Sequence, residues 1–155
     1  MHIDRYDEDR ALLLPLFKLA DDSPAQIARY ISRGEVLVAR DDDQVIGHVQ
    51  IVETEDVSVF ELKSMAVEET RQREGIGRSL IKAAVARCRV RNGHRLIVST
   101  AAADTGNLRF YQRQGFRMSR IVRDAFVLSN GYKEGIVVDG IPLRDQVFLE
   151  LDLDG

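Results

Sequence analysis

The chain has 155 residues, 45% of them hydrophobic and 30% charged, and its 22 basic and 25 acidic residues give a formal net charge of −3. This length and balance predict one globular domain without the excess positive charge of nucleic-acid-binding proteins. No apolar run reaches the roughly 18 residues that span a bilayer, and no signal pattern opens the sequence, so we expect no membrane partner. The single cysteine, Cys88, excludes an internal disulfide and favours a cytoplasmic location.

The first part of the chain is predicted to contain a short strand at residues 2–6 and two helices. The helical pattern at 12–20 contains Pro15, which predicts a break or kink. Ser23, Pro24 and Gln26 are typical of a capped helix start, and this helix should run to Arg33 and stop at Gly34. The strands expected next, joined by short hairpin turns, are 35–40, 45–52 and 58–67.

A helix from Ile76 to about Arg91 and an apolar strand at 94–100 come next. Strand 58–67, this helix and strand 94–100 form a β-α-β unit, so the two strands should be parallel.

The last part of the chain is predicted to begin with a short helix that Asp104 or Thr105 caps and that ends at Gly115. Residues 128–145 contain several turn-forming pairs and should form an irregular excursion or small hairpin. The late strands expected on either side of it are 116–127 and 146–153.

The segment Gln72–Gly77 joins strand 58–67 to the helix through two glycines. First-turn N–H groups of a helix have no intrahelical partner, the helix dipole adds positive partial charge, and glycine permits close backbone approach. Arg71, Arg73 and Arg78 add formal positive charge at the same end. We therefore expect this turn to bind a phosphate-bearing ligand.

Two common phosphate-binding motifs do not fit this turn. The P-loop string is absent, and the dinucleotide fingerprint fails because Leu80 occupies the place of its third glycine. The remaining pattern, Gln-x-x-Gly-x-Gly after a strand that ends in Ala66-Val67, resembles the acetyl-CoA pyrophosphate loop of the GCN5-related N-acetyltransferases. The stretch Asn107–Phe116, with its Asn, its Phe-Tyr pair and its final Gly-Phe, resembles the second signature of that family.

This resemblance implies an α/β (α+β) fold, with a mixed and mostly antiparallel sheet of about seven strands flanked by about four helices. It also implies that residues 1–155 are a single N-acetyltransferase domain, which moves the acetyl group of acetyl-CoA directly to a primary amine in a ternary complex, without a metal. The residues that the resemblance assigns to acetyl-CoA binding are Met65, Ala66, Val67, Gln72, Arg73, Glu74, Gly75, Ile76, Gly77, Arg78 and Asn107. A backbone amide of Met65 or Ala66 would serve the oxyanion.

Glu61 is the candidate catalytic base. Family members with a strand carboxylate place it six residues before the Val of the Ala-Val pair, as Glu61 precedes Val67 here. It would take the amine proton directly or through water. An exposed glutamate paired with Lys63 is the alternative interpretation, and Glu53, Asp56 or ordered water could replace it as base.

Tyr111 is the candidate catalytic acid. A phenol has a pKa of about 10 and keeps its proton at neutral pH, so Tyr111 could protonate the departing thiolate of CoA. Its spacing of four residues from Asn107 places both side chains on one helix face. An aromatic core residue is the alternative interpretation.

Other functions and the acceptor stay open at this level. A non-catalytic acyl-CoA-binding or regulatory module would need Gln72–Gly77 without the chemistry of Glu61 and Tyr111, and an interaction protein would use residues 128–145 as its contact arm. The late strands could form a homodimer, because we expect the final strand to have an exposed edge. The amine acceptor is not readable from the sequence: small amines, antibiotics, amino acids and protein amines all fit.

Overall fold

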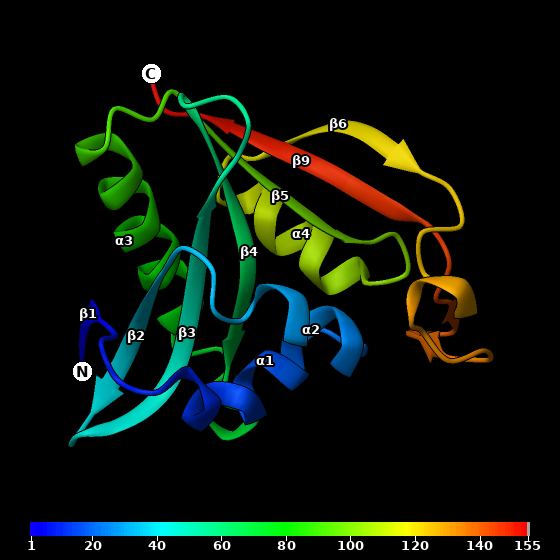
Figure 1. Cartoon of the computed structure of the whole chain (residues 1–155), viewed down its shortest axis with the longest axis horizontal. Coiled ribbons are helices and arrows are strands. Elements are labelled where there is room, and N and C mark those ends of the chain that lie inside the picture. Colours follow the sequence, from blue (N-terminus) through cyan, green and yellow to red (C-terminus); the bar gives the residue numbers. More distant parts are fainter. Residues whose placement is uncertain (155) are drawn as a thin grey trace.

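The computed structural model describes residues 1–154 and contains a seven-stranded sheet with helices on both faces (Figure 1). The strand order is β1-β2-β3-β4-β5-β9-β6, and only β4 and β5 are parallel. The strands are β1 (His2–Arg5), β2 (Glu35–Asp41), β3 (Gln44–Glu53), β4 (Val59–Val67), β5 (Arg95–Ala101), β6 (Arg117–Val122) and β9 (Gln146–Asp152). The α-helices are α1 (Leu14–Ala20), α2 (Pro24–Tyr30), α3 (Ile76–Val90) and α4 (Thr105–Arg113). The predicted fold class is confirmed.

Apolar side chains on both faces of the sheet are buried under helices. On one face, Leu80 of α3 packs in a cluster with Leu96 of β5. On the other face, Phe17 of α1 and Ile27 of α2 pack with Val38 of β2. Burying one such side chain contributes roughly 1.5–3 kcal/mol to the free energy of folding. The apolar side chains of each helix therefore determine which face of the sheet it covers. Among residues 1–154, no helix has the length and apolar character needed to cross a membrane.

The break or kink expected at Pro15 is present as a break, because the helical pattern divides into two helices and Pro15 lies in the first turn of the second. A 3-10 helix, η1 (Arg10–Leu13), ends just before it, and α1 begins at Leu14. Proline is tolerated there because first-turn N–H groups have no intrahelical acceptor.

The second helix ends earlier than expected, at Tyr30 instead of Arg33. The guanidinium of Arg10 donates hydrogen bonds to the carbonyl oxygens of Ile31, Arg33 and Gly34. These side-chain donors bind the carbonyls beyond the end of α2 and hold the chain in a turn.

The late strands also differ from expectation. β6 ends at Val122, where the N–H of Asp124 donates to the carboxylate of Asp145. The final strand, β9, lies between β5 and β6, so the exposed edge belongs to β6. The segment 128–145 forms a 3-10 helix, η3 (Leu128–Asn130), and a small hairpin of β7 (Val137–Val138) and β8 (Ile141–Pro142), as predicted.

Candidate active site

The parallel strands β4 and β5 separate halfway along their length. They pair from Val59 with Arg95 to Leu62 with Val98, and no pairing continues beyond this point within the described residues. Figure 1 shows the two strands diverging. The rest of β4 stays paired with β3 on its other side, so residues 63–67 present backbone groups to the gap. A ligand with amide groups could therefore bind there as an added strand does.

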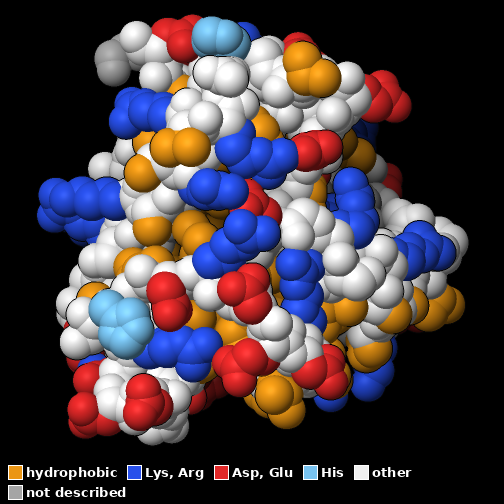
Figure 2. Space-filling view, turned by 60° about the vertical axis from the view of Figure 1, so that its left-hand side comes forward, with side chains coloured by type: hydrophobic (Ala, Val, Ile, Leu, Met, Phe, Trp, Pro, Cys, Tyr) orange, Lys and Arg blue, Asp and Glu red, His pale blue; other side chains and the backbone are white. Residues whose placement is uncertain are grey.

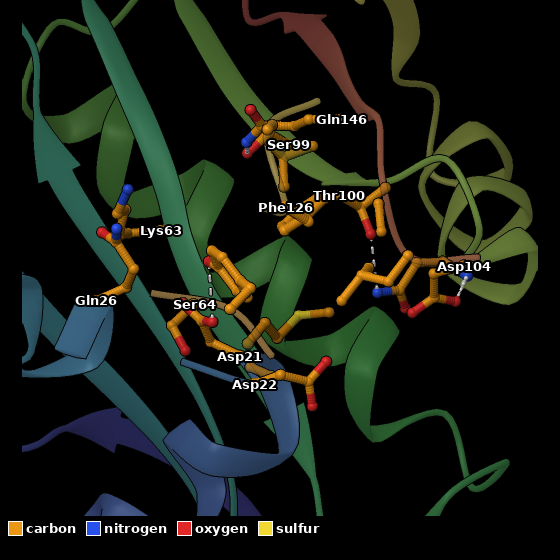
Figure 3. A pocket seen from close by; sticks show the side chains of 18 of the residues that line it. Asp21, Asp22, Gln26, Lys63, Ser64, Ser99, Thr100, Asp104, Phe126 and Gln146 are labelled. Atoms are coloured by element: carbon orange, nitrogen blue, oxygen red, sulfur yellow. Dashed lines mark hydrogen bonds between the residues drawn. The ribbon is translucent and has the colours of Figure 1, made fainter. Parts of the chain in front are cut away.

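A cleft of about 450 Å³ opens where the strands separate. It is lined by the ends of α1 and α2, by the separated parts of β4 and β5, by α4 and by the late segment of the chain (Figure 3). The structure brings Met65, Asn107 and Tyr111 together in this lining, although they come from different elements. The lining also includes Asp21, Asp22, Gln26, Tyr30, Lys63, Ser64, Thr100, Asp104, Phe126, Asn130 and Tyr132.

Tyr111 lies against the core and faces the cleft. Only 5% of its surface is exposed, and its ring packs edge-on against Phe110 and Phe116. Among residues 1–154 its hydroxyl has no hydrogen-bond partner. Burial, and then the nearby carboxylate of Asp104, raise the pKa of Tyr111 above its ordinary value. The phenol therefore stays protonated at neutral pH and can donate a proton or hydrogen bond into the cleft.

Asn107 lines the same cleft one turn before Tyr111. Its Nδ2 donates a hydrogen bond of 3.2 Å to Oγ1 of Thr100 at the end of β5. Its backbone N–H donates to Oδ1 of Asp104, the N-cap of α4, at 2.9 Å. These two bonds fix the first turn of α4 against the open end of β5.

Glu61 is not among the residues that line the cleft. It lies in the part of β4 that still pairs with β5, opposite Ile97. Its carboxylate lies 3.9 Å from Nζ of Lys63, which does line the cleft and also lies 5.0 Å from the centre of the Tyr30 ring. The pairing with Lys63 agrees with the alternative interpretation of Glu61, although the Glu61 side chain is only 20% exposed. A catalytic role would require a water molecule between its carboxylate and the cleft.

The turn Gln72–Gly77 leads into α3 with two residues in the left-handed region, Arg73 at φ 68° and Gly75 at φ 84°. Gly75 is the N-cap of α3, and a Cβ at this position would have no neighbour within 4 Å. A ligand can therefore approach the backbone closely at Gly75, immediately before the first-turn N–H groups of α3, as an anion site requires. Acetyl-CoA carries a pyrophosphate, and the residues present fit that group.

Side chains around this turn are less available to a ligand than the sequence suggested. Arg71 donates to Asp41 at 2.9 Å and pairs with Glu74 at 3.1 Å, so its charge is largely neutralised. The amide of Gln72 donates to the carbonyl oxygen of Val67 and closes the turn. Figure 2 shows Lys and Arg side chains gathered on the face of the molecule that carries α3.

The acidic residues Asp21 and Asp22 were missed by sequence reasoning. Oδ2 of Asp21 accepts a hydrogen bond from the hydroxyl of Tyr30 at 2.8 Å, and Oδ1 accepts from the hydroxyl of Tyr132 at 3.2 Å. Asp22 also lines the cleft, and burial, together with the charges of Asp21 and Asp104, raises the pKa of its carboxyl. In the sequence, the only feature that could have indicated them is the pair of adjacent carboxylates just before the N-cap of α2.

A buried pair beneath the cleft was also missed. Nε2 of His48 lies 2.8 Å from Oγ of Ser64, and the His48 ring lies 4.4 Å from the ring of Phe17. Burial lowers the pKa of His48 to about 3, so its ring is neutral. Its Nδ1 has no partner among the described residues. A bare acceptor there costs less than an orphaned N–H, which favours an Nε2–H that donates to Ser64 and leaves the serine hydroxyl free to donate into the cleft.

Comparison with known proteins places this architecture in a family. The family model described as "Acetyltransferase (GNAT) domain" matches residues 32–118. The N-acetyltransferase YvbK of Bacillus subtilis (strain 168) is 31% identical over 153 residues, which cover 99% of this chain and 97% of YvbK.

Solved structures agree with this assignment. A GNAT family acetyltransferase from Elizabethkingia anophelis with acetyl-CoA bound superposes with a TM-score of 0.88 at 29% identity and covers 97% of both chains. The IAA acetyltransferase from Bacillus cereus ATCC 14579 has a TM-score of 0.88 at 35% identity, over 97% of this chain and 98% of its own. With the separated strands, the glycine turn at α3 and this likeness together, the chain belongs to the GCN5-related N-acetyltransferase (GNAT) family and is an acetyl-CoA-dependent acetyltransferase.

Proposed function

We propose that this enzyme transfers the acetyl group of acetyl-CoA directly to a primary amine while both substrates are bound. The observation that supports this most is the protonated Tyr111 hydroxyl, which ends a largely buried side chain, forms no hydrogen bond among residues 1–154 and faces a cleft that opens between β4 and β5. Such a group is placed to protonate a departing thiolate, and the cleft of about 450 Å³ is where the amine and the thioester would meet for direct transfer.

For acetyl-CoA, we propose contacts along one side of the cleft and at the α3 turn. Backbone groups of Met65, Ala66 and Val67 would bind the pantetheine arm, and an amide of Met65 or Ala66 would donate to the oxyanion. Asn107 would contact the same arm. The backbone amides of the turn and first helical residues would hold the pyrophosphate, from residues Gln72, Arg73, Glu74, Gly75, Ile76, Gly77 and Arg78.

For proton transfer, we propose Tyr111 as the acid that protonates the departing thiolate. Glu61 remains the proposed base, with a water molecule carrying the amine proton, since its carboxylate lies beside Lys63 but Glu61 does not line the cleft. The cytoplasmic location predicted from the single cysteine belongs to the same proposal.

We also propose a homodimer that pairs through the β6 edge. Met118 and Ile121 on this edge strand are exposed large apolar side chains. Unpaired strand edges invite pairing with another chain. Light scattering should give twice the mass of the chain, and the mass of a single chain would contradict the dimer.

Initial-rate kinetics test the transfer itself. Release of free thiol from acetyl-CoA should depend on the presence of an amine, and double-reciprocal plots at several amine concentrations should intersect. Parallel lines would indicate an acetyl-enzyme and contradict direct transfer. The acceptor panel should include IAA, because the Bacillus cereus relative is named an IAA acetyltransferase.

A further inference from the structure

We infer that the acceptor is a small molecule with at least two cationic nitrogens, such as a linear diamine, and that Asp22 binds the ammonium that is not acetylated. This inference rests on the proposed function and adds a substrate class to it. It depends on the charge of the cleft, on the hydrogen bonds of its carboxylates and on the size of the space.

Negative charge dominates the lining of the cleft. Asp21 and Asp22 enter from the α1–α2 turn, and Asp104 enters from the opposite side, at the start of α4 (Figure 3). Among the lining residues, Lys63 is the one basic side chain, and it already pairs with Glu61. A cleft with this imbalance attracts a cation.

Asp22 is the carboxylate left for a ligand. Asp21 already accepts hydrogen bonds from two tyrosines and from the backbone N–H of Ser23. Asp104 accepts from the backbone N–H of Asn107 and caps α4. In the part of the chain that the structure describes, Asp22 has neither a hydrogen-bond donor nor an ion-pair partner. Asp22 is exposed to solvent, yet partial desolvation and then the negative charges of Asp21 and Asp104 raise its pKa, and the positive charge of a bound ammonium would offset that repulsion.

The Tyr111 hydroxyl is the second, independent sign of a ligand in this cleft. The Tyr111 side chain is only 5% exposed, and its hydroxyl forms no hydrogen bond within residues 1–154. Because Tyr111 lines the cleft, the hydroxyl is accessible from it, and the reacting end of a substrate could hydrogen-bond there. Asp22, Asp104 and Tyr111 all line this one cleft. A diamine could therefore present one nitrogen near Tyr111 and the other to Asp22.

The dimensions favour a small acceptor over a protein tail. The cleft measures about 450 Å³ and must also admit the thioester end of acetyl-CoA. On the acceptor side, Nε2 of Gln26 donates to the carbonyl oxygen of Asn130 at 2.9 Å, and Tyr132 donates to Asp21. These bonds join α2 and its preceding turn to the late segment and limit the access of a long chain.

The test compares diamines with matched monoamines in thiol-release assays. Linear diamines of three to six carbons are paired with monoamines of equal length, for the wild type, Asp22→Asn and the control Asp43→Asn. Asp43 lies in the β2–β3 turn, far from the lining, and its φ of 66° suits asparagine. For at least one length, the wild-type kcat/KM should favour the diamine roughly ten- to a hundredfold, as expected for one hydrogen bond between charged groups. In Asp22→Asn the ratio should fall to about two, which is expected only because a diamine has two equivalent amines. In Asp43→Asn the ratio should remain unchanged.

Two results would overturn the inference: equal use of monoamines and diamines by the wild type, or a diamine preference that survives Asp22→Asn. Calorimetric titration of the CoA-saturated protein with the same diamines separates this inference from the proposed function. Binding that requires Asp22 without any thiol release would support the cation site and contradict the proposed transfer. No binding of any diamine to the wild type would overturn the cation site, whatever other amines are acetylated.

Discussion

The hydroxyl of Tyr132 donates a hydrogen bond of 3.2 Å to Oδ1 of Asp21, across 111 positions of the chain. The other oxygen of the same carboxylate accepts from Tyr30 in α2 at 2.8 Å. Asp21 therefore connects α2 to the segment 128–145, and both parts line the cleft on the side that we propose for the acceptor. β7 and β8 pair only with each other, so contacts such as this hydrogen bond and the packing of the Tyr132 ring against Phe126 hold that segment.

Tyr132→Phe should weaken acceptor binding. A hydrogen bond to a charged group contributes roughly 1.5–3 kcal/mol, and part of this remains because Tyr30 still binds Asp21, so we expect the acceptor KM to rise about three- to tenfold. The Kd of acetyl-CoA should not change. Tyr6→Phe is the matched control, since the Tyr6 hydroxyl donates to the carbonyl oxygen of Asp9 at 2.8 Å, outside the cleft. Equal effects of the two variants on the acceptor KM would contradict this role of Tyr132.

Gly75→Ala should impair acetyl-CoA binding more than stability. Alanine at φ 84° costs roughly 1–2 kcal/mol of backbone strain, and its methyl group enters the space where the phosphates should approach. Gly135→Ala has the same kind of strain at φ 78°, also with no neighbour within 4 Å, but lies away from α3. Both variants should show similar losses in thermal unfolding. Only Gly75→Ala should raise the Kd of acetyl-CoA, by about tenfold or more, which corresponds to about 1.4 kcal/mol.

If the affinity for acetyl-CoA fell equally in both variants, backbone strain and not the phosphate site would be responsible.

The wild-type protein should gain thermal stability with acetyl-CoA and with CoA, by about 2.7 kcal/mol at one hundred times the Kd, and should gain none with NAD.

His48 should make the protein less stable in mild acid. Its folded pKa of about 3 lies below the ordinary value of 6.5, so the unfolded chain binds a proton that the folded chain does not. The contribution of His48 is therefore complete above pH 6.5 and declines as the pH falls toward 3, by up to about 1.4 kcal/mol per pH unit. In urea unfolding at pH 7.5 and pH 5, His48→Gln should lose less stability on acidification than the wild type.

His94 provides a control with the opposite sign. Asp154 accepts a hydrogen bond from its exposed ring and raises the pKa of His94, so its contribution is present below pH 6.5 and is lost as the pH rises. His94→Gln should therefore increase the loss on acidification. If His48→Gln and the wild type lost the same free energy of unfolding between pH 7.5 and pH 5, the buried neutral state of His48 would be contradicted.

The sequence allowed prediction of features that depend on neighbouring residues. The start of α3 is recognisable from a strand, two glycines and a helix, which lie together in the chain. The cap of α2 was predicted for the same reason, and Ser23 accepts from the N–H of Gln26 as expected. The side chain of Gln26 instead donates to Asn130, 104 positions away. A local capping pattern cannot reveal a competing acceptor so distant in the chain.

The acidic cleft and the position of Glu61 depend on tertiary structure. The spacing of Glu61 from Val67 fixes its place along β4, whereas its access to the cleft depends on where β5 separates, which is after Leu62. Asp21 and Asp22 resemble a solvated turn until the segment 128–145 folds beside them. The His48–Ser64 pair likewise arises from the register of β3 and β4, which shifts after Gln50.

Tyr111 should be the acid for an acetyl transfer that takes place in this cleft, and this is the claim on which the proposed mechanism depends most. The most direct test is to measure kcat and the Kd of acetyl-CoA for the wild type and for Tyr111→Phe. Removal of a positioned general acid should lower kcat by about 10²–10⁴-fold. The Kd of acetyl-CoA should stay nearly unchanged because the turn Gln72–Gly77 is intact. Equal kcat values for the two proteins would contradict the acid role and move the chemistry away from Tyr111.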